Sequence, residues 1–143
     1  MADRHPALAA LDVLVGTWDT EGKHRLIDET IRGTATFEWL AGEQFLLQRS
    51  RADNPRIPEG LSIFGPAEAG NGLAVDYFDS RGVRRSYQLS LEHGVLRYWR
   101  EASDFDQRFT ATIGEEMFVA EIEYAETPGA WQHDMELIYR RRH

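Results

Sequence analysis

The chain has 143 residues, no cysteine and a formal net charge of -8, with 16 Lys and Arg against 24 Asp and Glu. This length corresponds to one domain that can bury a core without cross-links. The lack of cysteine excludes disulfides, thiolate metal sites and a cysteine nucleophile, and it fits a cytoplasmic protein. The acidic balance argues against binding to nucleic acid, which requires a basic face.

The first predicted element is a short helix over residues 6–15. Proline stands at its start, leucines recur every third residue from Leu8 to Leu14, and Gly16 follows. This pattern predicts one amphipathic helix that must pack on the rest of the chain to be stable. The same segment is too short and too interrupted for a secretion signal or a membrane span, so neither is expected.

From Gly16 onward, strand-like segments alternate with turn signals. The lack of intervening helices disfavours a doubly wound parallel fold, and consecutive hairpins favour a closed barrel over a two-sheet sandwich. We therefore predict an all-β, lipocalin-like fold in a single domain, 1–143. It is an antiparallel up-and-down barrel of about ten strands over 16–140, with helix 6–15 closing one end. The predicted strands are 17–23, 32–40, 44–51, 61–64, 73–79, 83–91, 95–101, 107–113, 117–124 and 131–140.

Each predicted strand has one apolar, aromatic-rich face and one polar face. In the last strand, strict alternation puts Trp131, His133, Met135, Leu137 and Tyr139 on one side. A polar outer face indicates a water-soluble barrel, because an outer-membrane barrel has the opposite pattern. A barrel of this size either fills its interior with side chains or holds one small ligand.

The segment Gly16-Thr17-Trp18 after a helix, the predicted strands and the basic end of the last strand resemble the calycin superfamily. This group contains lipocalins, fatty-acid-binding proteins and nitrobindin-like haem barrels. The resemblance implies that Trp18 faces an arginine of a late strand across the closed end, here Arg140 or Arg141. Such stacking contributes about 0.5–2 kcal/mol. The segments 77–82 and 131–134 also look like uncharacterised bacterial lipocalin-like proteins.

The same resemblance implies an alternative function. Nitrobindin-like proteins show Gly-x-Trp-x-Gly-x-Gly and take the axial haem ligand from a histidine of the final strand. This chain has Gly16, Trp18 and Gly22, but residues 19–21 lie where the middle glycine is expected. On this alternative His133 is the haem ligand. No other cofactor and no metal site is expected.

The candidate ligand-binding residues are those that alternation places inside the barrel. His133 is expected to bond within the core, to ligate haem iron or to contact a polar ligand head. Arg85 with Tyr87 suits a ligand carboxylate, unless Arg85 reaches water at the rim or pairs with a carboxylate. Five large aromatic side chains are also expected to face inward, where they either line a ligand pocket or form a packed core. They are Trp39, Tyr77, Trp99, Trp131 and Tyr139.

We therefore expect a barrel that binds a small, mostly apolar ligand. The alternatives are a haem barrel that uses His133, and a filled-core barrel that acts as an interaction module or a homodimer. No catalytic triad order, phosphate-binding loop or dinucleotide fingerprint is present. No catalytic residue is assigned for this reason.

Overall fold

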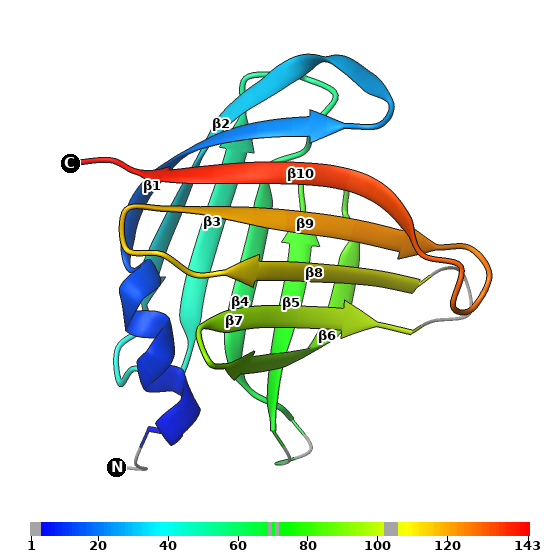
Figure 1. Ribbon diagram of the computed structural model, residues 1–143. Coiled ribbons are helices and arrows are strands. Elements are labelled where there is room, and N and C mark those ends of the chain that lie inside the picture. Colours follow the sequence, from blue (N-terminus) through cyan, green and yellow to red (C-terminus); the bar gives the residue numbers. More distant parts are fainter. Residues whose placement is uncertain (1–3, 69, 71, 102–105) are drawn as a thin grey trace.

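The computed structural model describes residues 4–68, 70, 72–101 and 106–143. Neighbouring strands are all antiparallel, and β1 pairs with β10 as well as with β2, so the sheet closes into a barrel (Figure 1). The predicted all-β barrel with an N-terminal helix is confirmed. The elements are η1 (Pro6–Leu14), β1 (Gly16–His24), β2 (Ile27–Trp39), β3 (Leu46–Ala52), β4 (Gly60–Pro66), β5 (Leu73–Asp79), β6 (Arg84–Glu92), β7 (Val95–Arg100), β8 (Asp106–Thr112), β9 (Met117–Ala125) and β10 (Gln132–Arg141).

Strand β2 departs most from its predicted bounds. It begins at Ile27 instead of Arg32, directly after a two-residue turn at Arg25 and Leu26. Residues 28–30 are all exposed, and the register between β1 and β2 shifts beside them. Three polar residues in a row carry no alternation between apolar and polar side chains, so no strand is predicted there.

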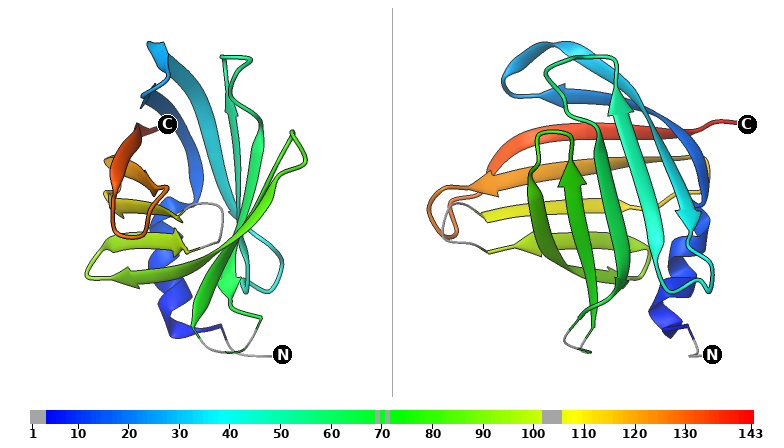
Figure 2. Two further views of the ribbon diagram at one scale, coloured as in Figure 1. Left: turned by 90° about the vertical axis from the view of Figure 1, so that its right-hand side faces the viewer. Right: turned by 180° about the vertical axis from the view of Figure 1, so that it is seen from behind.

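Helix η1 is a 3₁₀ helix that covers one end of the barrel. Leu8, Leu11 and Leu14 are at most 1% exposed. Their three-residue spacing places them on one face of a helix with three residues per turn. The helix lies at the opposite end of the barrel from the hairpin that joins β9 and β10 (Figures 1 and 2). No helix in the described part of the chain is long and apolar enough to cross a membrane.

Aromatic side chains fill the half of the barrel next to η1. Trp18 is 0% exposed, and its indole nitrogen donates to the carbonyl oxygen of Leu14 over 2.8 Å. Its ring meets Phe118 edge to face at 5.0 Å, and Phe118 stacks on Tyr139 at 4.5 Å. Each such pair contributes about 0.5–1.5 kcal/mol beyond the area that it buries.

The last strand ties this end together through Arg141. Its guanidinium carbon lies 4.3 Å from the centroid of the Trp18 ring. The same group donates to the carbonyl oxygens of Val13, Val15 and Glu115, the latter two over 2.8 and 2.6 Å. The late-strand arginine that the resemblance implied is thus Arg141.

Candidate functional site

The half of the barrel away from η1 encloses a cavity of about 880 Å³. Side chains from the β1–β2 turn, the β3–β4 loop and the β5–β6 turn line its mouth, among them Leu26, Ile57 and Arg81. The volume lies within the range of small-molecule sites, about 300–1,000 Å³. The filled-core alternative does not account for a hollow of this size.

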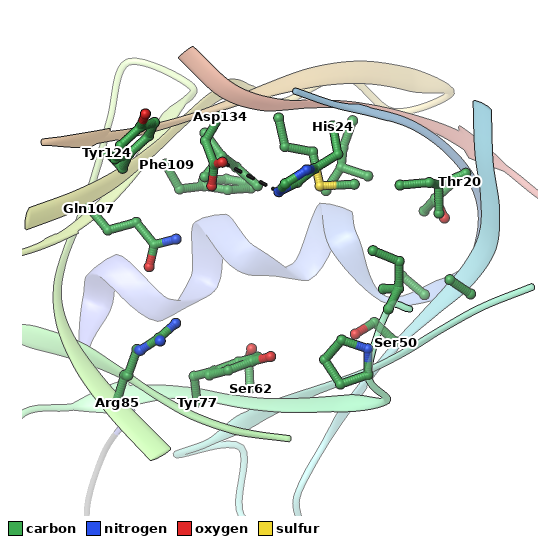
Figure 3. A pocket seen from close by; sticks show the side chains of 18 of the residues that line it. Thr20, His24, Ser50, Ser62, Tyr77, Arg85, Gln107, Phe109, Tyr124 and Asp134 are labelled. Atoms are coloured by element: carbon green, nitrogen blue, oxygen red, sulfur yellow. Dashed lines mark ion pairs between the residues drawn. The ribbon is translucent and has the colours of Figure 1, made fainter. Parts of the chain in front are cut away.

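The cavity has two unlike walls. Figure 3 looks into it with η1 behind, and shows Ser50, Ser62, Tyr77 and Arg85 along one side and Phe109 on the other. The first wall is polar, formed by β3 to β6, with the side chains of Gln48, Ser50, Ser62, Tyr77, Arg85 and Tyr87. The second comes from β8 to β10 and β2, and its apolar members are Phe109, Ile122, Met135, Leu137, Ile27, Ile31 and Ala35.

Tyr77 is fixed by a buried carboxylate at the end of β5. Its hydroxyl donates to Asp79 over 2.8 Å, and Asp79 also accepts from the guanidinium of Arg81 over 2.7 Å. The Asp79 side chain is 0% exposed. The hydrogen bonds from Arg81 hold the pKa of Asp79 well below its usual range, while burial and then Asp79 raise the pKa of Tyr77. Tyr77 therefore stays neutral, and its hydroxyl hydrogen is used in the hydrogen bond to Asp79.

Arg85 and Tyr87 occupy neighbouring inward positions on β6. Arg85 lies opposite Tyr77 in the β5–β6 pair and points into the cavity (Figure 3). The hydroxyl of Tyr87 donates to Oε1 of Gln107, on β8, over 2.5 Å. Burial raises the pKa of Tyr87, and the charge of Arg85 opposes that rise. This hydrogen bond turns the amide oxygen of Gln107 toward Tyr87.

Two more tyrosines complete the aromatic lining. Tyr98 stacks on Phe109 at 4.3 Å and meets Tyr87 edge to face at 5.2 Å. Burial raises the pKa of Tyr98 well above its usual value and that of Tyr139 to about 12. At neutral pH these side chains offer hydroxyl groups, not phenolates.

At the mouth of the cavity, Asp134 links β10 to the β1–β2 hairpin. Its Oδ1 accepts from Nε of Arg25 over 3.0 Å and lies 3.3 Å from Nε2 of His24. The backbone N–H of Leu26 donates to Nδ1 of His24 over 3.1 Å, so the proton of a neutral His24 belongs on Nε2. Among the described residues, no three His, Asp or Glu side chains are grouped to hold a metal ion.

The cavity brings together four of the eight residues predicted from the sequence. Arg85, Tyr87, Tyr77 and Tyr139 line it. Their contact with a ligand stays a prediction. The other four predicted residues, His133, Trp39, Trp99 and Trp131, do not belong to the lining.

The predicted inward orientation of His133 is wrong. His133 pairs with Glu123 and Met135 with the adjacent Ile122, so Asp134 is an extra residue in β10. This bulge reverses the alternation. His133 therefore shares the outer face with Glu123, and its Nδ1 lies 3.2 Å from Glu121. Its side chain is 49% exposed.

These positions do not fit haem ligation by histidine. His133 lies outside the barrel, and His24, which does line the cavity, has both ring nitrogens in contact with Leu26 and Asp134. An axial ligand needs a nitrogen that faces the iron. His133 therefore cannot ligate a haem held in this cavity.

The three tryptophans lie elsewhere for separate reasons. Trp39 packs beside η1, where its indole nitrogen donates to Asp12 over 2.9 Å. Trp99 pairs with Arg108 on β8, whereas the neighbouring Tyr98 pairs with the buried Phe109 and takes the inward position on β7. Trp131 precedes β10 and lies 4.0 Å from the guanidinium of Arg108.

Sequence reasoning also missed the small polar residues of the lining. Gln48 and Ser50 lie in phase with the fully buried Leu46 on β3, and Ser62 lies in phase with Phe64 on β4. A hydroxyl or amide on the same face as a core residue was a usable signal. It distinguishes a cavity wall from a packed core, since a packed core leaves such groups without partners.

No protein-family model matches the sequence, and no curated protein is similar to it. Among solved structures, Rv2717c from M. tuberculosis is similar with a TM-score of 0.66 at 16% identity, over 99% of this chain and 100% of that chain. EF1p2_mFAP2b bound to DFHBI matches with a TM-score of 0.48 at 11% identity, over 95% and 99% of the two chains. The likeness to Rv2717c concerns the fold alone, an antiparallel barrel in which β1 pairs with β10.

Proposed function

We propose that this barrel binds a small, mostly apolar organic molecule in its interior, without a covalent step. The observation that carries the proposal is the cavity of about 880 Å³ inside a closed barrel, lined by apolar and aromatic side chains with a few polar groups. Small-molecule sites have this combination of volume and lining.

The energy for such binding comes from the apolar wall. Ile122, Met135 and Leu137 keep part of their surface accessible although they point into the barrel. A ligand that covers about 200 Å² of apolar surface would contribute on the order of 5 kcal/mol. Part of that free energy offsets the ligand's loss of translational and rotational freedom.

The carboxylates beside the cavity favour binding over catalysis. Asp79 and Asp134 are each held by an arginine, and the pKa of Asp79 is lowered. A general acid at neutral pH needs the opposite shift. Asp79 therefore orients Tyr77 and does not serve as a general acid at neutral pH.

The test is native mass spectrometry of the protein purified from its own host, which should show a retained small molecule. Leu137→Trp fills the cavity from β10 and should abolish the added mass. Ile138→Trp, one residue along the same strand, projects to the other face and should retain it. Loss of the ligand in both variants, or in neither, would contradict binding in the interior.

A further inference from the structure

We infer that the ligand is an apolar molecule without charge, an alcohol or a ketone whose oxygen contacts the hydroxyl groups of Ser50 and Ser62. This inference rests on the proposed function, because it needs the cavity to be a ligand site. It adds the charge of the ligand, its polar group and its orientation between the two walls.

The first support is that the charged side chains at the mouth are already paired with one another. Asp134 accepts from Arg25 over 3.0 Å and lies 3.3 Å from His24. Asp79 accepts from Arg81 over 2.7 Å. A charged ligand group that bound any of these residues would have to compete with a partner that the protein itself supplies.

The remaining charges of the lining lead to the same conclusion. The carboxylate of Glu123 accepts from Arg108 over 2.8 and 3.1 Å, and Arg85 is engaged in an interaction within the protein as well. The other charged residues that the structure describes in the lining are exposed to solvent, and they are Arg51, Arg56 and Glu126. A charge buried in the interior without a partner of its own is strongly unfavourable. A neutral molecule leaves all of these pairs intact.

The second support is a row of uncharged polar side chains on the wall formed by β3 to β6. Ser62 lies directly opposite Tyr77 on β5 and Gln48 on β3, and Ser50 follows two residues after Gln48 on the same face. Side chains that face each other across two strands have Cβ atoms about 4.5–5.5 Å apart. One ligand oxygen can therefore reach more than one of these groups.

Two members of this row have hydroxyl groups that remain for a ligand. The Tyr77 hydroxyl is used by Asp79, whereas no other residue within the described ranges forms a hydrogen bond with the hydroxyl of Ser50 or Ser62. Both serines line the cavity, on the same side of it as Tyr77 (Figure 3). A hydroxyl donates one hydrogen bond and accepts two, so it can serve a ligand hydroxyl or a carbonyl oxygen.

Gly60 keeps the space that this arrangement needs. A Cβ atom on Gly60 would lie 3.0 Å from Oγ of Ser50 and 3.1 Å from a ring carbon of Tyr77. The missing side chain thus allows both residues to lie against β4 while they line the cavity.

The two unlike walls then fix the orientation of the ligand. A hydrocarbon that covered Ser50 and Ser62 would remove their hydrogen bonds to water without replacing them, which is unfavourable. An alcohol or a ketone replaces those hydrogen bonds at one edge. Its apolar part then covers the opposite wall, which contains Ile122, Met135 and Leu137.

The test is a fluorescence titration of the full chain with four pyrene probes that differ in one substituent. They are pyrene-1-methanol, 1-methylpyrene, pyrene-1-carboxylate and 1-pyrenemethylamine. We expect the alcohol to bind about threefold to tenfold more tightly than methylpyrene, the effect of one hydrogen bond. It should bind at least about tenfold more tightly than the acid and the amine, because a charge is not buried without a partner.

Substitution of the two serines tests the position of the ligand oxygen. Ser50→Ala combined with Ser62→Ala should bring the affinities for the alcohol and for methylpyrene together. Ser86→Ala combined with Ser90→Ala is the matched control. These serines alternate with the buried Tyr87 and Leu89, so they lie on the outer face of β6. The control should keep the preference for the alcohol.

Each contrary outcome has a defined meaning. If the acid or the amine binds as tightly as the alcohol, or if methylpyrene does, the inference fails while the proposed function stands. Equal effects of the two double substitutions would also overturn the inference. If none of the four probes binds, both proposals fail. The comparison among the probes uses the unmodified chain, so it decides the question even if the serine variant does not fold.

Discussion

Gly16 and Arg141 lie so close together that a Cβ atom on Gly16 would be 2.8 Å from Nη1 of Arg141. Gly16 also has a φ of +129°, a backbone conformation that residues with a side chain rarely adopt. The same guanidinium covers Trp18. The glycine before Thr17-Trp18 therefore leaves the space through which the end of β10 reaches the closed end of the barrel.

Gly16→Ala should destabilise the protein by about 1–3 kcal/mol, because it adds both backbone strain and a contact with Arg141. Urea unfolding gives the free energy of unfolding. Gly42→Ala is the matched control, since Gly42 has a φ of +94° but nothing within 4 Å of its added Cβ. Gly42→Ala should lower the free energy of unfolding by less, because this substitution adds backbone strain but no close contact. Equal losses would show that the approach of Arg141 has no energetic effect.

Arg141→Lys should cost about 2–3 kcal/mol. The substitution keeps the charge but cannot serve Val13, Val15 and Glu115 together, and it loses the planar stacking on Trp18. Arg140→Lys changes the adjacent residue, which faces outward, and should stay within about 0.5 kcal/mol. A small effect of Arg141→Lys would mean that the positive charge alone, without the hydrogen bonds and the stacking on Trp18, stabilises the η1 end of the barrel.

Trp18→Ala should destabilise the fold by about 3–5 kcal/mol, as large-to-small changes in a core do. Trp18 is fully buried and contacts Phe118 and Tyr139. Trp131→Ala removes a half-buried tryptophan just before the last strand and should cost about 1 kcal/mol. Chemical denaturation of both variants measures the difference. An unchanged midpoint for Trp18→Ala would contradict its place in the core.

The barrel could be predicted from the sequence because most strands alternate without interruption. On β5 and β6 the period of two correctly placed Tyr77, Arg85 and Tyr87 inside. The predicted side-chain orientation was wrong where a bulge interrupts the two-residue alternation of the strand. The extra residue Asp134 turns His133 outward, and no feature of residues 131–135 marks a bulge.

Adjacent aromatic residues set a second limit on prediction. Tyr98 and Trp99 are both large, and alternation alone does not say which of them faces inward on β7. The register settles it, since Tyr98 lies opposite the buried Phe109 and Trp99 opposite Arg108. The pairing between distant strands is tertiary information that a single strand does not contain.

His133→Leu should change the free energy of unfolding by less than about 0.5 kcal/mol. The pair that His133 forms with Glu121 is exposed on both sides, and exposed ion pairs contribute little. Absorbance spectra recorded with added haemin should be the same for the variant and the unmodified protein. A loss of several kcal/mol, or a haem band that disappears only in the variant, would contradict the outward position of His133.

The protein should lose stability above about pH 10. Burial raises the pKa of Tyr139 to about 12, and those of Tyr77, Tyr87 and Tyr98 also rise. Tyrosines of the unfolded chain release their protons near pH 10, before the folded protein does. Between these values the unfolded state binds fewer protons, so the free energy of unfolding falls as pH rises. Below about pH 10 both states keep these protons and the contribution is fully present.

Urea unfolding across this pH range, together with near-ultraviolet absorbance of phenolate, tests this expectation. Phenolate absorbance from the buried tyrosines should appear with unfolding and not before it. Tyr139→Phe removes one of the raised groups, so its stability should fall less steeply with pH than that of the unmodified protein. Ionisation of all tyrosines near pH 10 in a protein that remains folded would show that water and hydroxide reach the whole interior.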